Sequence, residues 1–485
     1  MRKLCAGIEV IMLIIPLNLG SKIPLYEQIY EYIKREIKTG KLPVATKLPS
    51  SRNLAQSLQI SRSTVELAYQ QLISEGYIES VPKSGYYVQG IADLIRITER
   101  KQSHSKEKVE KVERLTYDFS PFAVDLSEFP FSTWRKLSNQ CMNDMNQSLF
   151  LLGENQGDLS LREAIGAYLH SSRGVKVDAS QIIVGAGADY LLVLLSQILG
   201  NEQIIAMENP VYKRAYRIFQ GVPYPIRPIT VNSDGISIEE LMETDATIVY
   251  VTPSHQYPLG AVMPIKRRLE LLRWAAKGND RYIIEDDHDS EFRYKGKPIP
   301  SLQGIDENDR VIYLGTFSRA IAPAIRMGYM VLPQRLYQIY KEKYSFYAST
   351  VSRIDQAIVC EFLNGGYFER HVNKMRKRYK MKHDLLLREL KLYEDRISIT
   401  GENAGLHIVV SFHTSLTEQE IINKARKQQI ELYPLSKHYI TDYQPDEPAF
   451  LLGFANLSEK LIVAGVKLLM KELFKSTIDK VSRLL

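Results

Sequence analysis

Six short apolar runs in the middle of the 485-residue chain constrain its fold more than any other feature. They are rich in β-branched residues, bounded by Gly, Pro and Asp, and separated by stretches of helical periodicity, at residues 182–184, 204–207, 248–251, 282–284, 311–313 and 328–332. Continuous apolar runs of this length are typical of strands buried on both faces. Because they alternate with helical patterns, they predict an α/β domain with a mostly parallel sheet.

Composition narrows the class of protein further. Apolar residues make up 45% of the chain, which is too many for a disordered protein. The three cysteines, Cys5, Cys141 and Cys360, lie far apart and outside any Cys/His cluster, so neither a disulfide framework nor a zinc site is expected. No run reaches the ~18 apolar residues that span a bilayer. We therefore expect a soluble protein of the reducing cytoplasm, without a metal or a membrane partner.

Residues 1–20 are interpreted as an N-terminal extension. A basic start followed by apolar residues imitates a signal peptide, but Glu9 and Pro16 interrupt the apolar run. Whether residues 1–11 belong to the natural protein stays open. Residues 1–90 hold 11 basic and 7 acidic side chains, so +4 of the formal net charge of +7 lies in under a fifth of the chain. This excess hints at contact with nucleic acid.

Residues 21–90 predict a DNA-binding module. Helical spacing of apolar residues predicts a first helix over 23–39, ended by Gly40, and a second over 51–58, capped by Ser50 or Ser51. A third helix follows a two-residue turn, with Ser63 and Glu66 as a possible capping box and Gly76 at its end. The sequence helix, tight turn, helix suits binding in a major groove.

A wing and a polar helix start complete this module. Two β runs, 77–80 and 86–88, enclose a turn with Lys83 at its tip. The third helix begins with Ser61, Arg62, Ser63 and Thr64, at the end that reaches base edges in a helix-turn-helix. The planar fork of Arg62 suits guanine or phosphate, although each basic residue taken singly could be an ordinary solvated charge.

The module resembles the GntR family of winged-helix regulators over about residues 22–89. The resemblance rests on Lys47-Leu-Pro-Ser-Ser-Arg-Asn-Leu-Ala55, Ile60-Ser-Arg-Ser-Thr-Val65, Glu75-Gly-Tyr-Ile78 and Lys83-Ser-Gly85. It implies binding of double-stranded operator DNA through Arg52, Arg62, Thr64 and the wing around Gly85, beside Ser61 and Lys83.

Residues 91–116 are predicted to form a charged linker. Nearly every residue from Arg96 to Arg114 is charged or polar, so this stretch cannot bury itself. Composition leaves helix and coil open for it.

Polar segments follow five of the predicted strands, and ligands of such sheets bind outside the carboxyl ends of the strands. The segments are 185–190, 208–214, 252–260, 285–289 and 315–328. The glycine turn at 185–187 could offer bare amides to a phosphate, although a plain tight turn explains it as well. Among the carboxylates of 285–289, one suits a protonated ring nitrogen, and the others could merely be solvated.

In this order the five segments resemble the fold-type I aminotransferase domain, which uses pyridoxal 5′-phosphate (PLP). Together with the first module they resemble the MocR subfamily of GntR regulators, from about residue 22 to the end. The resemblance implies a winged helix-turn-helix (α+β) joined by the linker to an α/β aminotransferase fold with a small C-terminal α+β subdomain. Residues 117–485 would bind an effector, PLP or a related anionic ligand, and would form a homodimer.

The resemblance also implies roles for single residues. Tyr212 would stack on or flank the ring, Asp286 would pair with the pyridinium nitrogen and Ser318 would help to hold the phosphate. The implied cofactor-binding residues are Gly187, Ala188, Tyr212, Asp286, His288, Ser318, Arg319 and Arg326, and the implied effector-binding residues are Arg214, His255 and Gln256.

Three departures from the family pattern bear on catalysis. Arg319 stands where the family has its Schiff-base lysine, and no lysine occurs between Val311 and Leu332. A guanidinium has a pKa above ~12 and no free amine, so it cannot form the imine. His288 replaces the usual Tyr and Ala188 the frequent Ser or Thr, while residues 450–454 lack an arginine for a substrate carboxylate. Each substitution could also have an ordinary role; Arg319, for example, could bind an anion.

These observations leave a main hypothesis and two alternatives. The main one is a dimeric transcription regulator of MocR type whose large domain senses PLP without covalent attachment, or does not bind it. No residue is assigned a catalytic role. The first alternative is a PLP-dependent aminotransferase with an accessory DNA-binding domain, and the second is a degenerate relative that is inactive in both roles.

Overall fold

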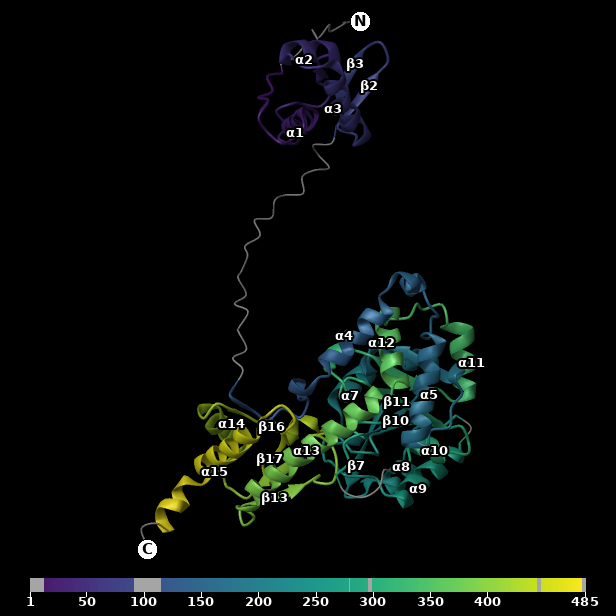
Figure 1. The fold of residues 1–485 in the computed structure, drawn as a ribbon, viewed down its shortest axis with the longest axis vertical. Coiled ribbons are helices and arrows are strands. Elements are labelled where there is room, and N and C mark those ends of the chain that lie inside the picture. The colour runs from purple at the N-terminus through teal and green to yellow at the C-terminus, as the bar shows by residue number, and fades with distance from the viewer. Residues whose placement is uncertain (1–12, 91–114, 279, 295–298, 443–445, 482–485) are drawn as a thin grey trace, which may run out of the picture. The chain divides into compact units, whose positions relative to one another are not determined.

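The computed structural model describes residues 13–90, 115–278, 280–294, 299–442 and 446–481. The chain forms two compact units, Met1–Val112 and Glu113–Leu485, which are described separately below (Figure 1). Residues 1–11 and the linker predicted over 91–116 lie outside the described residues, apart from residues 115 and 116.

The small unit contains three helices and a three-stranded antiparallel sheet. The helices are α1 (Leu25–Lys38), α2 (Ser51–Leu58) and α3 (Arg62–Ser74), and the strands, in the order β1-β3-β2, are β1 (Lys47–Leu48), β3 (Gly85–Val88) and β2 (Ile78–Val81). The predicted helices and wing are confirmed, and Gly40 and Gly76 both have φ of +75° just beyond the ends of α1 and α3. The two-residue strand β1 was not predicted.

The core of the small unit joins all three helices. Val65, Ala68, Tyr69 and Leu72 of α3 are buried. Leu13 and Ile15, which we assigned to the N-terminal extension, are buried in the same core.

The predicted capping box at Ser63 is wrong. The helix α3 begins earlier, because the Ser61 hydroxyl accepts the Thr64 amide at 3.2 Å and caps it. The carboxylate of Glu66 instead accepts hydrogen bonds from Arg62 and from the Ser51 hydroxyl of α2.

The large unit is built on an eight-stranded sheet of order β5-β12-β11-β10-β9-β6-β7-β8. Six of its strands are those predicted, namely β5 (Ile182–Gly185), β6 (Ile205–Asn209), β9 (Ile248–Val251), β10 (Tyr282–Asp286), β11 (Val311–Thr316) and β12 (Gly328–Val331). All neighbouring pairs are parallel except those of β12 and the β7–β8 pair. The strand β7 (Ile226–Asn232) was missed because it mixes polar and apolar residues, includes a proline and is mostly not buried, and β8 (Gly235–Ile236) was missed because it has only two residues.

Helices cover both faces of this sheet, which therefore forms the middle of three layers (Figure 1). Alternate residues of each strand face opposite sides: Ile183 packs with α6, whereas Ile182 and Val184 pack with α5 and α12. On the first side lie α6 (Ala188–Leu199), α7 (Lys213–Gln220) and α11 (Gln334–Lys343). On the other lie α4 (Phe131–Cys141), α5 (Leu159–Arg173), α8 (Ile238–Glu243), α9 (Ile265–Ala276), α10 (Leu302–Ile305) and α12 (Arg353–Asn364).

A smaller α+β subdomain ends the chain, as predicted. Its antiparallel sheet has the order β13 (Ile397–Thr400), β14 (His407–Phe412), β17 (Ala449–Gly453), β16 (Tyr433–Pro434). The helices α13 (Tyr367–Lys391), α14 (Glu418–Lys427) and α15 (Glu459–Val481) accompany it, and β15 (Ile430–Glu431) pairs with β4 (Tyr117–Asp118). Short 3-10 turns are η1 (Leu126–Glu128), η2 (Asp144–Phe150), η3 (Ala179–Gln181), η4 (Pro323–Ile325) and η5 (Leu435–His438). Among the described residues, no helix combines the length and the apolar character that crossing a bilayer requires.

Gly453 allows the segment before η1 to lie against β17. Its amide donates to the Phe119 carbonyl at 2.9 Å, and a Cβ atom there would lie 2.0 Å from the Ser120 carbonyl oxygen and 2.8 Å from the Pro121 Cα. A side chain at this position would therefore push the two backbones apart.

We predict that Gly453→Ala lowers the free energy of unfolding of the large unit by on the order of 1–3 kcal/mol, because both colliding groups are backbone. Thermal unfolding followed by circular dichroism measures this change. The control is Gly166→Ala, since a Cβ in that helical position lies 3.6 Å from its nearest neighbour and Ala favours a helix. A melting temperature of Gly453→Ala equal to that of the unaltered chain would contradict the close approach.

Candidate functional site

Eight of the eleven predicted site residues of the large unit line a cavity of about 180 Å³ at the carboxyl edge of the sheet, whereas Gly187, His255 and Gln256 do not. The parallel strands β6, β10 and β11 end at the same edge, so the segments after them converge. The cavity is lined by Phe122, Ala188, Asp189, Tyr212, Arg214, Asp286, His288, Thr316, Ser318, Arg319, Pro323 and Arg326.

One end of the cavity suits an anion. Gly187, with φ of +87°, precedes the first turn of α6, which has no side-chain cap, and a Cβ atom there would lie 3.0 Å from Nη2 of Arg326. The Ser318 amide donates to the Thr316 hydroxyl at 3.1 Å on the neighbouring loop. A helix N-terminus beside an arginine and hydroxyl groups is a good environment for phosphate.

Asp189 balances the arginines at this end. Its Oδ2 lies 3.4 Å from Nη2 of Arg326 and 3.9 Å from Nη1 of Arg214. All three side chains remain about half exposed, so these contacts are weak and a bound anion can compete for both guanidinium groups.

Asp286, the last residue of β10, is the carboxylate that faces the cavity. It is 8% exposed and accepts a hydrogen bond from the buried Tyr250 hydroxyl. Burial raises the pKa of Asp286 to about 6. A cationic ring nitrogen would favour the ionised form, and Tyr212, whose pKa burial raises to about 12, lines the cavity beside it.

Arg319 is held in a buried ion pair with Asp289. Its Nε and Nη2 atoms each donate to a carboxylate oxygen at 2.8 Å, and Nη1 donates to the Pro121 carbonyl at 2.9 Å. Burial alone would raise the pKa of Asp289, but the guanidinium holds it well below its usual range. The charge of Arg319 is thus already neutralised within the protein, which argues against its use as an anion clamp.

The two histidines differ in their access to the cavity. His288 lines the cavity, and burial lowers its pKa to about 4, so its imidazole is neutral at pH 7. His255 is fully buried, with its ring centroid 6.2 Å from that of His288, and does not line the cavity. Ligand atoms of both residues and of Asp289 lie within 4.8 Å of one another, as in a metal site. Arg319 occupies both Asp289 oxygens, however, and its positive charge opposes a cation there.

Gln256 is also kept away from the cavity. Its Nε2 donates to the Pro210 carbonyl at 3.1 Å and to Glu208 at 3.3 Å, and its Oε1 accepts the Leu259 amide at 2.9 Å. The structure therefore gives the side chain of Gln256 internal partners and leaves it no contact with the cavity.

The other carboxylates of 285–289 are not solvated, contrary to the alternative above. Asp287 is buried and forms a two-point ion pair with Arg173, at 2.9 Å from Nε and 2.8 Å from Nη2. Glu285 accepts the amides of Leu302 and Gln303 at the start of α10, at 2.8 and 2.9 Å. These carboxylates fix the loop that presents Asp286.

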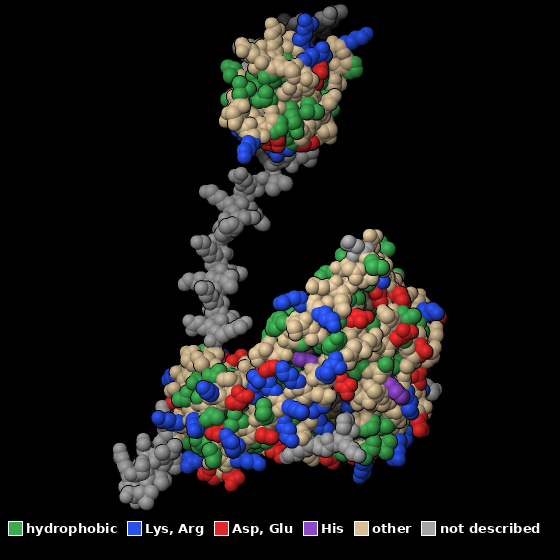
Figure 2. All heavy atoms as spheres, in the orientation of Figure 1, with side chains coloured by type: hydrophobic (Ala, Val, Ile, Leu, Met, Phe, Trp, Pro, Cys, Tyr) green, Lys and Arg blue, Asp and Glu red, His purple; other side chains and the backbone are tan. Residues whose placement is uncertain are grey.

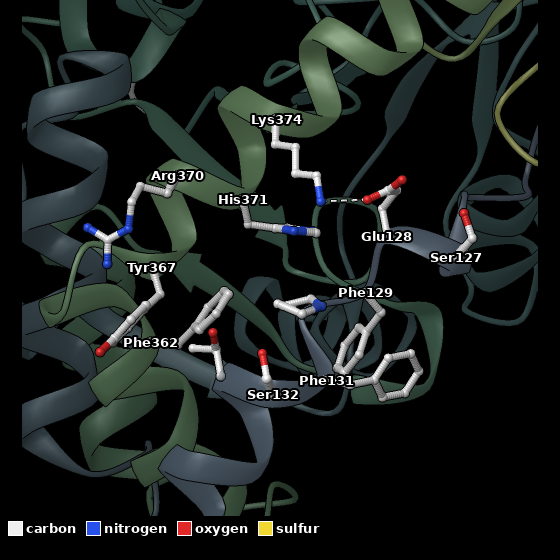
Figure 3. Close-up of a pocket in the computed structure, with 12 residues that line it drawn as sticks. Ser127, Glu128, Phe129, Phe131, Ser132, Phe362, Tyr367, Arg370, His371 and Lys374 are labelled. Carbon is white, nitrogen blue, oxygen red and sulfur yellow. Dashed lines mark ion pairs between the residues drawn. The ribbon is translucent and has the colours of Figure 1, made fainter.

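A second, more open hollow of about 580 Å³ lies between η1, α4, α12 and α13. Figure 3 shows Lys374 reaching toward Glu128 across it, at 2.6 Å, with the rings of Phe129, Phe131 and Phe362 nearby. No predicted site residue lines this hollow.

The predicted DNA-binding residues lie on α2, α3 and the wing. Arg52 and Arg62 are exposed, and Nε of Arg62 donates to Glu66 at 2.7 Å. Ser61 caps α3 and Thr64 is partly buried in its first turn, while Lys83 and Gly85 have positive φ, +63° and +119°, in the wing turn. Figure 2 shows Lys and Arg side chains at both ends of the visible face of the small unit.

Several residues of the cavity were not predicted. Asp189 directly follows the predicted Ala188, Thr316 lies two residues before the predicted Ser318, and Phe122 and Pro323 add apolar walls. No separate role was predicted for Asp289 among the carboxylates of 285–289, because nothing in the sequence reveals that Arg319, 30 residues later, is its partner.

Comparison with protein families identifies both units. Residues 25–88 match the family described as bacterial regulatory proteins, gntR family, and residues 122–460 match aminotransferase class I and II. Kynurenine aminotransferase from Pyrococcus horikoshii has a similar structure, with a TM-score of 0.68 and 25% identity over 80% of this chain and 99% of that one.

Three curated relatives share both units. The uncharacterized HTH-type transcriptional regulator YdeL of Bacillus subtilis is 42% identical over 93% of this chain and 97% of its own. The pyridoxine biosynthesis regulator PdxR of Corynebacterium glutamicum is 32% identical over 82% and 85%, and the probable rhizopine catabolism regulatory protein MocR of Rhizobium meliloti is 31% identical over 93% and 94%. The chain therefore belongs to the MocR-like HTH-type transcription regulators of the GntR family, which join a helix-turn-helix domain to an aminotransferase class I and II domain.

Proposed function

We propose that this regulator binds operator DNA through α3 and the wing, and that its large unit senses PLP or a related anionic ligand without a covalent bond. For the DNA-binding role, Arg52, Arg62, Lys83 and the Ser61 cap lie where a winged helix meets a duplex. The observation that carries the ligand-sensing role is the buried Arg319–Asp289 pair at the floor of the cavity.

The cavity residues fit a flat, phosphorylated, cationic ring. The α6 N-terminus, Ser318 and Arg326 would hold the phosphate, Asp286 would hold the ring nitrogen, and Tyr212 would flank the ring. PLP, when bound, supplies an aldehyde and an electron-withdrawing ring to an amine. The relative named for pyridoxine biosynthesis regulation is compatible with such a ligand.

Covalent attachment does not fit these residues. Arg319 offers no primary amine, and its guanidinium is engaged by Asp289 and the Pro121 carbonyl. The cavity lining can therefore hold a ligand, but it includes no primary amine that could form an imine with PLP or move the proton that transamination requires. This favours ligand sensing over the alternative of an aminotransferase.

We further propose that the chain acts as a homodimer through its large unit. Two neighbouring segments expose Met145, Phe150, Leu151, Leu152 and Phe346 at 68–95% of their surface. They are held together, because Asn155 donates to the Ser345 carbonyl at 2.6 Å. An apolar patch of this kind suits an interface with a second copy, and two-fold symmetry would place two small units on two half-sites.

For DNA binding, we expect Arg62→Ala to weaken binding to operator DNA by about 1–3 kcal/mol and to reduce the slope of log affinity against log salt by about one. Fluorescence anisotropy at several salt concentrations measures both. The control is Arg335→Ala, which removes an arginine that is 62% exposed, against 65% for Arg62, and has a comparable carboxylate partner in the large unit. Unchanged affinity and slope in Arg62→Ala would remove its assigned role.

For ligand binding, we expect the fluorescence of the unaltered chain to be quenched when PLP is titrated into it. After borohydride reduction and denaturation, the unaltered chain should carry no PLP. In Arg319→Lys, which restores an amine, reduction should attach PLP to residue 319, located by peptide mass spectrometry. Asp286→Ala should weaken the non-covalent binding at least about tenfold, because a charged hydrogen bond is lost. The control is Asp245→Ala. Asp245 is an exposed carboxylate that pairs with Arg227 and does not line the cavity. PLP fixed to a lysine of the unaltered chain would contradict the proposal.

For assembly, Leu152→Asp combined with Phe346→Asp should shift the chain toward monomers, because each carboxylate would have to be buried in the interface. Sedimentation velocity measures the change. Leu392→Asp, which alters one leucine that is 68% exposed at the end of α13, is the control and should sediment like the unaltered chain. A double variant that sediments like the unaltered chain would rule out this surface.

A further inference from the structure

The outward face of α3 carries an exposed leucine. Val65, Ala68, Tyr69 and Leu72 of this helix are buried in the core, and Ile73 packs against it. Leu67 alone among the apolar residues of α3 is exposed, at 48% of its surface.

Helix geometry places Leu67 in the middle of the face that the core does not use. At about 100° per residue, Leu67 points within about 30° of the direction opposite to the mean direction of the buried side chains. Ser63 lies one turn before it and Gln70 one turn after it, and both are exposed. Leu67 thus lies between a serine and a glutamine, on a face whose other side chains can form hydrogen bonds.

The major groove contains one apolar group that could meet such a side chain. In a helix-turn-helix the outward face of the second helix lies against the base edges, and its first turns reach deepest. Every base presents hydrogen-bonding groups there, but thymine alone among the four DNA bases adds a methyl group, at C5. Leu67 lies in the second turn of α3, within this zone.

We propose that Leu67 contacts the C5 methyl group of a thymine in the operator and so specifies a T·A pair in each half-site. This inference rests on the proposed operator binding by α3. Leu67 would add sequence preference, whereas Arg62, tied to Glu66 at 2.7 Å and exposed at the start of the helix, would add phosphate or guanine contact.

The test replaces each thymine of the operator by uracil, which removes only the methyl group. The operator is first selected from random duplexes with the full chain, and affinities are then measured for the unaltered chain and for Leu67→Ala. At one position per half-site we expect uracil to weaken binding of the unaltered chain about fourfold, the effect of one CH₂-sized group leaving an apolar contact. Leu67→Ala should bind thymine and uracil duplexes equally at that position.

The control is Leu269→Ala, the same change at a leucine that is 42% exposed on α9 of the large unit, which should keep the full sensitivity to uracil. The inference fails if no uracil substitution weakens binding, or if Leu67→Ala keeps the same sensitivity at every position. In that case Arg62→Ala still reports on operator binding itself. A chain that selects no duplex at all would overturn the proposed function together with this inference.

Discussion

The ion pair between Arg319 and Asp289 determines what chemistry the cavity of the large unit can perform. Arg319 follows the end of β11 and lines the cavity. Its guanidinium donates to both Asp289 carboxylate oxygens at 2.8 Å and to the Pro121 carbonyl at 2.9 Å. A buried charge without its partner would be strongly destabilising, so neither side chain is free to act on a ligand. The pair also ties Pro121, before η1, to the loops after β10 and β11.

Around this pair lie the residues that suit an anionic ligand. Asp286 is buried with a pKa of about 6, the α6 N-terminus lacks a side-chain cap, and Arg214 and Arg326 are held only weakly by the half-exposed Asp189. Under the proposed function, this cavity holds a charged, flat ligand and lacks the amine that would react with it. For a regulator this is sufficient, since an equilibrium is shifted by differential binding and needs no turnover.

Most of the fold could be predicted from the sequence because the six strands are apolar on both faces, short, and bounded by Gly, Pro and Asp, which favours strands over buried helices. The strand β7, which mixes polar and apolar residues, and the two-residue strand β1 were missed, because their pairing depends on neighbours and not on their own pattern. In the site, position along the chain predicted which segments converge but not which way each side chain points. His255 and Gln256 follow the end of β9 and Asp286 ends β10, yet His255 and Gln256 face the interior. The partner of Arg319 was equally hidden, since Asp289 comes from another strand end.

The visible absorption spectrum of the chain during addition of PLP tests the role of the Arg319–Asp289 pair most directly. We predict that bound PLP keeps the absorption band of its free aldehyde and separates from the protein on gel filtration. A shifted band that stays with the protein through gel filtration would contradict it.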